Sequence, residues 1–99
     1  MMQDQIDRIS EWRNIAVKHI SKGDIYNAMQ VLRHILGTDP SLGDIWMRLG
    51  ICLYAVGNHG DAFYCLTQAS FCKIDEKTSH TIEKYLNKVS GKLHRFFAS

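Results

Sequence analysis

The sequence lacks any apolar run long enough to cross a membrane. Its longest apolar stretch, residues 49–56, is far shorter than the roughly 20 residues that a bilayer-spanning helix needs. The first residues also lack the basic and apolar segments of a secretory signal. We therefore expect no membrane span and no export signal.

Neither positive nor negative charge is in large excess. The formal net charge is +2, which argues against nucleic-acid binding by the whole surface, because duplex-binding domains carry a clear basic excess. The excess is local, since residues 76–99 carry +3 and residues 1–75 carry −1. A solvated basic helix face is the favoured interpretation of residues 76–99, and an anionic or nucleic-acid partner is the weaker alternative.

The chain also lacks paired cysteines. Cys52, Cys65 and Cys72 are an odd number, which in a chain without an export signal indicates reduced thiols and a cytoplasmic protein. No Cys-x-x-Cys spacing favours zinc. We expect all three thiols to pack in the core and predict no metal and no cofactor.

Catalytic patterns are equally scarce. Five histidines are scattered along the chain with no carboxylate at a helix spacing that suggests a catalytic dyad. The 99 residues are 45% hydrophobic and 22% charged, which is typical of one small globular domain. We predict a single domain, residues 1–99, that is not an enzyme.

An internal repeat of 34 residues is the strongest positive signal. Four identities recur at this spacing without insertion: Trp12 and Trp46, Gly23 and Gly57, Ala28 and Ala62, and Leu32 and Leu66. The repeat predicts two copies of one unit, at residues 9–42 and 43–76.

The repeat resembles the tetratricopeptide repeat (TPR). In the second copy the family's signature positions are occupied by Trp46, Leu49, Gly50, Leu53, Ala62, Leu66 and Ala69. The first copy keeps Trp12, Ala28, Leu32 and Pro40 but departs at His19 and Ile35, and the second copy ends in Ile74 instead of proline. The resemblance implies an all-α solenoid of two helical hairpins.

Periodicity and breakers place the helices. Gly23 and Gly57 mark helix ends, and Pro40 interrupts the chain between the copies. We predict helices over residues 3–21, 25–37, 43–56, 59–73 and 77–97. The last is not a third repeat, and its apolar stripe predicts a capping helix: Ile82, Leu86, Val89, Leu93 and Phe96.

Protein binding is the favoured use. The resemblance implies a concave face made by the first helix of each hairpin, with these residues on it: Arg13, Val17, Ile20, Ser21, Met47, Arg48, Ile51, Tyr54 and Ala55. The asparagines with which some members bind acidic tails are missing. A mostly apolar groove favours an amphipathic helix, and the two arginines favour an acidic rim on it. Packing of Val17, Ile20 and Ile51 against the cap is the alternative.

Tyr64 and Phe71 form a second candidate surface. They lie seven residues apart at positions that the family leaves polar and exposed, so they indicate contact with another chain. Coverage by the capping helix is the alternative interpretation.

The small size and two repeats suggest a more specific resemblance. The chain is similar to small bacterial type III secretion chaperones of the needle-subunit type, which implies that it holds the amphipathic helix of a secreted subunit, often with a small helical co-chaperone. Because solenoids usually need three repeats, we expect a hetero-oligomer or a homodimer. The alternative is a scaffold or adaptor subunit of a larger cytosolic assembly.

Overall fold

The computed structural model describes the backbone of residues 2–98 and the side chains of residues 7–95. The backbone forms five helices: α1 (Met2–Ser21), α2 (Ile25–Thr38), α3 (Gly43–Ala55), α4 (His59–Phe71) and α5 (Glu76–Ala98). Residues 2–98 contain no strand. The predicted all-α class is confirmed, and every predicted helix has both ends within two residues of the observed ones.

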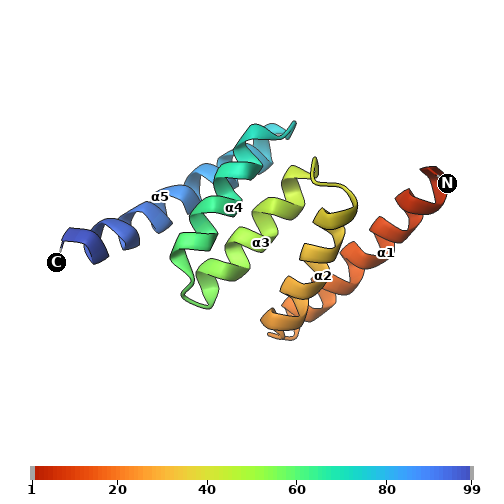
Figure 1. Ribbon diagram of the computed structural model, residues 1–99, viewed down its shortest axis with the longest axis horizontal. Helices are drawn as coiled ribbons and strands as arrows, with labels where there is room; N and C mark the ends of the chain where they lie inside the picture. Colours follow the sequence, from red (N-terminus) through yellow and green to blue (C-terminus); the bar gives the residue numbers. More distant parts are fainter. Residues whose placement is uncertain (1, 99) are drawn as a thin grey trace.

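The helices pack side by side in chain order (Figure 1). Each helix contacts the next, and α5 also reaches α3, whereas the backbone of α1 comes within 8 Å of no helix but α2. The molecule is elongated, with extents of 51 × 28 × 21 Å. Contacts between sequence neighbours therefore dominate the packing.

Gly23 and Gly57 end the first helix of each hairpin with the same geometry. Their φ angles are +77° and +85°, in the left-handed region that favours glycine. In each turn the amide after the glycine donates to the carbonyl five residues earlier, at 2.8 Å in both cases. This hydrogen bond is the 6→1 bond of a Schellman motif. The turn geometry thus recurs at the 34-residue spacing of the sequence.

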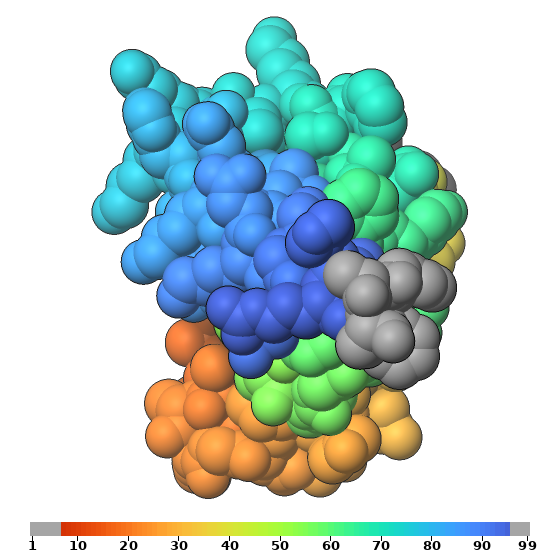
Figure 2. Space-filling view, turned by 90° about the vertical axis from the view of Figure 1, so that its left-hand side faces the viewer, coloured from red at the N-terminus to blue at the C-terminus, as the bar shows by residue number. Residues whose placement is uncertain are grey.

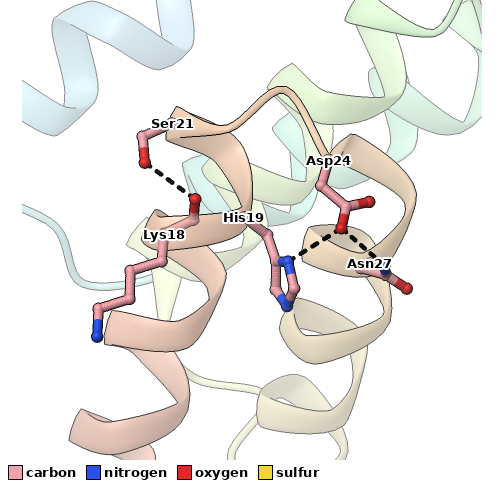
Figure 3. Close-up of polar contacts among 5 residues, drawn as sticks. All are labelled: Lys18, His19, Ser21, Asp24 and Asn27. Carbon is pink, nitrogen blue, oxygen red and sulfur yellow. Dashed lines mark hydrogen bonds and ion pairs between the residues drawn. The ribbon is translucent and has the colours of Figure 1, made fainter.

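An Asp–Asn side-chain pair closes each turn, with the aspartate first in the chain in one turn and the asparagine first in the other. In the first, Asn27 Nδ2 donates to Asp24 Oδ2 at 2.7 Å, and His19 Nδ1 lies 3.2 Å from the same oxygen (Figure 3). In the second, Asn58 Nδ2 donates to Asp61 Oδ2 at 2.8 Å. The hydrogen bond from Asn27 lowers the pKa of Asp24, because it favours the ionised carboxylate.

The crossing of α3 and α4 depends on Gly50. A Cβ at this position would lie 2.7 Å from Leu66 Cγ and 3.3 Å from the carbonyl oxygen of Ala62. Ala62 and Leu66 are completely buried. The absence of a side chain at Gly50 therefore lets α3 and α4 approach closely. Ala16, which takes the equivalent place in the first hairpin, is also completely buried.

The link between the hairpins is a short turn. Asp39 is extended, with φ −144° and ψ 95°, as the following proline requires. Its Oδ1 accepts hydrogen bonds from the amide of Ser41 at 3.0 Å and from Ser41 Oγ at 2.6 Å, which lowers the pKa of Asp39. Trp46 Nε1 donates to the carbonyl of Pro40 at 2.8 Å. The break predicted between the two copies is confirmed.

The apolar stripe of α5 faces the rest of the molecule. Ile82 and Val89 are buried, and Leu86 and Leu93 are half-buried. Phe96, which completes the predicted stripe, lies outside the described side chains. Burying each large aliphatic side chain contributes about 1.5–3 kcal/mol relative to exposure, so this face holds α5 against α3 and α4.

Candidate functional site

An apolar groove separates α1 from α3. The groove has a volume of about 300 Å³ and is lined by Ile20, Ile25, Met47, Arg48, Ile51, Cys52 and Ala55. Five residues of the predicted concave face therefore come together in it: Ile20, Met47, Arg48, Ile51 and Ala55. The sequence analysis did not place Ile25 and Cys52 on this face; they come from the start of α2 and from the core side of α3.

Arg48 joins this groove to a polar pocket at the start of α3. The polar pocket has a volume of about 450 Å³, and its charged lining residues are Arg13, Asp44, Arg48, Lys73 and Asp75. Arg13 Nη2 donates to Asp44 Oδ1 at 3.3 Å, across the gap between α1 and α3. The Nε atoms of Arg13 and Arg48 are buried and have no hydrogen-bond partner.

Tyr54 lies outside the apolar groove and contacts α5. Its ring centroid is 5.9 Å from that of Tyr85, with the planes at 77°, and 5.5 Å from the ring of His59. An edge-to-face pair such as that of Tyr54 and Tyr85 contributes about 0.5–1.5 kcal/mol beyond area burial. Tyr54 therefore stabilises the docking of α5, and a separate role in binding stays a prediction.

Val17 differs from its predicted neighbours on the concave face. It is 40% exposed and lines neither the apolar groove nor the polar pocket. The backbone of α5 approaches α3 and α4 to within 8 Å but not α1. The exposure of Val17 shows that the capping helix does not cover it. Packing of the half-buried Ile20 and Ile51 against the cap stays the alternative interpretation.

Tyr64 and Phe71, the second candidate surface, lie on α4 and are called the outer face below. Tyr64 is 57% exposed and Phe71 is 80% exposed, so the alternative that α5 covers them is wrong. A cleft of about 440 Å³ lies between α2 and α4 with α3 as its floor. Trp46 and Tyr64 meet in it edge to face at 6.1 Å. Exposed Tyr26 and Phe63 add apolar area that the sequence analysis did not anticipate.

Two histidines have carboxylate neighbours that the sequence analysis missed. His80 Nε2 lies 3.7 Å from Glu76 Oε1, one helical turn earlier, and both side chains are well exposed. His19 pairs with Asp24 at the end of α1. Neither pair lines any of the clefts described here. Glu76 lies in the first turn of α5 and His19 in the last turn of α1, where the helix dipole favours a carboxylate and a basic group respectively.

The thiols are sheltered to different degrees. Cys52 and Cys65 are buried, whereas Cys72 is half-buried, which is more exposure than the sequence analysis expected. Burial raises the pKa of Cys65 to about 11, with the Asp61 carboxylate acting in the same direction, and burial also raises the pKa of Cys52. Among residues 7–95, no three histidine, cysteine or acidic side chains gather closely enough to hold a metal ion.

We expect Cys72 to be alkylated much faster than Cys52 and Cys65 at pH 8. The thiolate is the reactive form, and the raised pKa values keep the buried pair protonated. The pKa of Cys65 is about 11 in the folded state and 9.0 ordinarily, so the free energy of unfolding also depends on pH. The contribution of Cys65 to stability is fully present below pH 9 and is lost as the pH rises toward 11. Iodoacetamide labelling followed by mass spectrometry, in the native state and in denaturant, measures the rates. Equal native rates for the three thiols would contradict the described core.

None of the helices in the described part of the chain has the length and apolar character that crossing a bilayer requires. A comparison of the sequence with models of known protein families found no match, and a comparison with curated proteins found none either.

Proposed function

We propose that the chain is a non-enzymatic protein-binding module that holds an amphipathic helix of a partner in the groove between α1 and α3. The observation that carries this proposal is the groove itself, which brings Ile20, Met47 and Ile51 from two helices around one apolar space. A ligand helix with apolar residues at i, i+3, i+4 and i+7 matches such a groove.

Membership of the TPR class is part of the proposal. It is supported by the two glycine turns with equal hydrogen bonds 34 residues apart. It is also supported by the close crossing at Gly50 and Ala62, because these are signature positions of the repeat. On this proposal α1 with α2 and α3 with α4 are the two hairpins, and α5 is the cap of a single domain.

More specifically, we propose a cytoplasmic chaperone of the type III secretion needle-subunit type. Support comes from the two similar glycine turns, the packing of α5 on α3 and α4, and the open groove. The ligand would be the amphipathic helix of a secreted subunit, with or without a small helical co-chaperone, in a hetero-oligomer or a homodimer. A TPR scaffold or adaptor subunit in a larger cytosolic assembly is the alternative, and it would use the same groove.

Selection from a displayed library of helical peptides, each about 18 residues long, tests the groove without knowledge of the partner. We expect the wild-type chain to enrich peptides with an i, i+3, i+4, i+7 apolar stripe. An enriched peptide at about 100 times its Kd would stabilise the fold by about 2.7 kcal/mol, which raises the melting temperature by several degrees. Enrichment of extended peptides without that stripe, or of none, would overturn the proposal.

A further inference from the structure

The C-terminal half of α5 brings three cations into one pocket with Tyr54. Lys88, Lys92 and Arg95 line this space of about 320 Å³ together with Asn87 and Gly91. All three cations are exposed, and no carboxylate lines the pocket. The ammonium group of Lys88 lies 5.2 Å from the ring centroid of Tyr85, a cation–π distance that restrains its position. Their helix face is therefore an organised basic wall.

This basic pocket adjoins the apolar groove. Tyr54 precedes Ala55, the last residue of α3 that lines the groove, and follows Ile51 by one helical turn. Figure 2 shows the end of α3 between α5 on one side and the region of the α1–α2 turn on the other. A helix that fills the apolar groove over the end of α3 therefore passes beside the cations of α5.

Arginine side chains border the apolar groove at its other end, toward the start of α3. Arg48 belongs to both the apolar groove and the polar pocket, and its buried Nε has no hydrogen-bond partner. Arg13 donates to Asp44 through Nη2, while its own Nε is likewise buried and unpaired. Buried donors without partners are costly, because each has lost its hydrogen bonds to water. A ligand carboxylate can approach both guanidinium groups, because Arg13 lines the polar pocket and Arg48 lines both the pocket and the apolar groove.

We propose that the helix held in the groove is acidic, with carboxylates on one flank facing Lys88, Lys92 and Arg95 and carboxylates on the other facing Arg13 and Arg48. This inference rests on the proposed function and specifies the chemistry of its ligand. Opposite charges around an apolar contact accelerate association and select among partners that share the apolar stripe. A basic amphipathic helix would be repelled by the three cations of α5, which have no carboxylate beside them, whereas the polar pocket holds Asp44 and Asp75 beside its cations.

The peptide selection described above gives the first test. We expect enriched peptides to carry Asp or Glu on both sides of the apolar stripe and to be depleted of Lys and Arg there. Binding of a labelled acidic peptide should weaken as sodium chloride rises from about 50 to about 500 mM, because salt screens exposed pairs. Enrichment of neutral or basic helices would contradict the inference of an acidic ligand, but it would not contradict the binding of a helix in the groove.

Two matched triple variants give the second test. Replacement of the α5 wall by Lys88→Gln, Lys92→Gln and Arg95→Gln should weaken the acidic peptide about tenfold, equivalent to about 1.4 kcal/mol. The control, Lys18→Gln, Lys22→Gln and Lys77→Gln, removes the same charge from residues that line none of these pockets. Binding of the control should stay within about twofold of wild type, and circular dichroism verifies that both variants are folded.

The outcomes separate this inference from the proposed function. Equal affinities for wild type and the α5 variant, or equal losses in both triple variants, would overturn the basic wall while leaving helix binding intact. If a selected peptide binds the Ile51→Asp variant as tightly as wild type, the groove is not the binding site, and the inference of an acidic ligand fails with it. Tight binding of a fluorescein-labelled single-stranded DNA at about 150 mM salt, lost in the α5 variant, would assign the cations to nucleic acid and overturn the inference.

Discussion

Ala62→Glu is expected to unfold the chain. Ala62 is completely buried, and its carbonyl oxygen lies where α4 comes closest to Gly50 of α3. A glutamate there has no space, so an ionised carboxylate would be forced into an apolar helix crossing. Such a charge costs several kcal/mol, against a total stability of about 5–15 kcal/mol for a domain of this size. Thermal melts followed by circular dichroism measure the loss.

Two exposed positions serve as controls for Ala62→Glu. Gln30→Glu makes the same change of charge on the exposed side of α2, and Lys88→Glu makes a larger one on α5. The free energy of unfolding of both variants should lie within about 1 kcal/mol of the wild-type value, since surface substitutions rarely cost more. Equal melting of all three variants would contradict the described register of α3 and α4.

Ile51→Asp is expected to abolish capture of a helical ligand while the chain stays folded. Ile51 is half-buried and lines the apolar groove, so its replacement places a charge against the ligand's apolar stripe. Loss of a central anchor typically costs 2 kcal/mol or more, which is roughly thirtyfold in affinity. Calorimetry with a selected peptide measures the affinity, and Ile20→Asp should act in the same direction from the opposite wall.

The outer face supplies the comparison for Ile51→Asp. Tyr64→Ala combined with Phe71→Ala should leave affinity for the peptide unchanged, because both side chains lie outside the groove. Tyr54→Ala is a less clean variant, since it also removes the ring contacts with His59 of α4 and with Tyr85 of α5. Intact binding in Ile51→Asp, with binding lost in the outer-face variant, would move the ligand to the α2–α4 side.

Local signals predicted the helices well. The positive φ of Gly23 and Gly57 and the extended backbone of Asp39 are properties of single residues and their neighbours. Gly50 was informative for another reason, because a missing side chain in an apolar stripe requires a partner helix to fill the space. Helix ends and the α3–α4 crossing were therefore predictable from the sequence.

Placement of α5 against α3 was not predictable in the same way. The apolar stripe of α5 indicated which face is buried, but its position along α3 depends on packing between side chains far apart in sequence. That position turns Tyr54 toward Tyr85 and brings Lys88 beside it. Sequence analysis therefore treated Tyr54 as a groove residue and the lysines as a solvated face. The exposed Tyr64 and Phe71 follow from the same placement.

The position of α1 at one end of the row has a consequence for its dynamics. Its backbone approaches α2 alone, and the ion pair between Arg13 and Asp44 is its described polar link to α3. Arrays held by neighbour contacts open from their ends, so the amides of α1 should exchange with solvent through partial openings that leave α3 and α4 intact. Because Ile20 forms one wall of the groove, each such opening also dismantles the proposed binding surface. A ligand that joins α1 to α3 would slow this exchange selectively, and the protection gained by α1 amides would report its residence time.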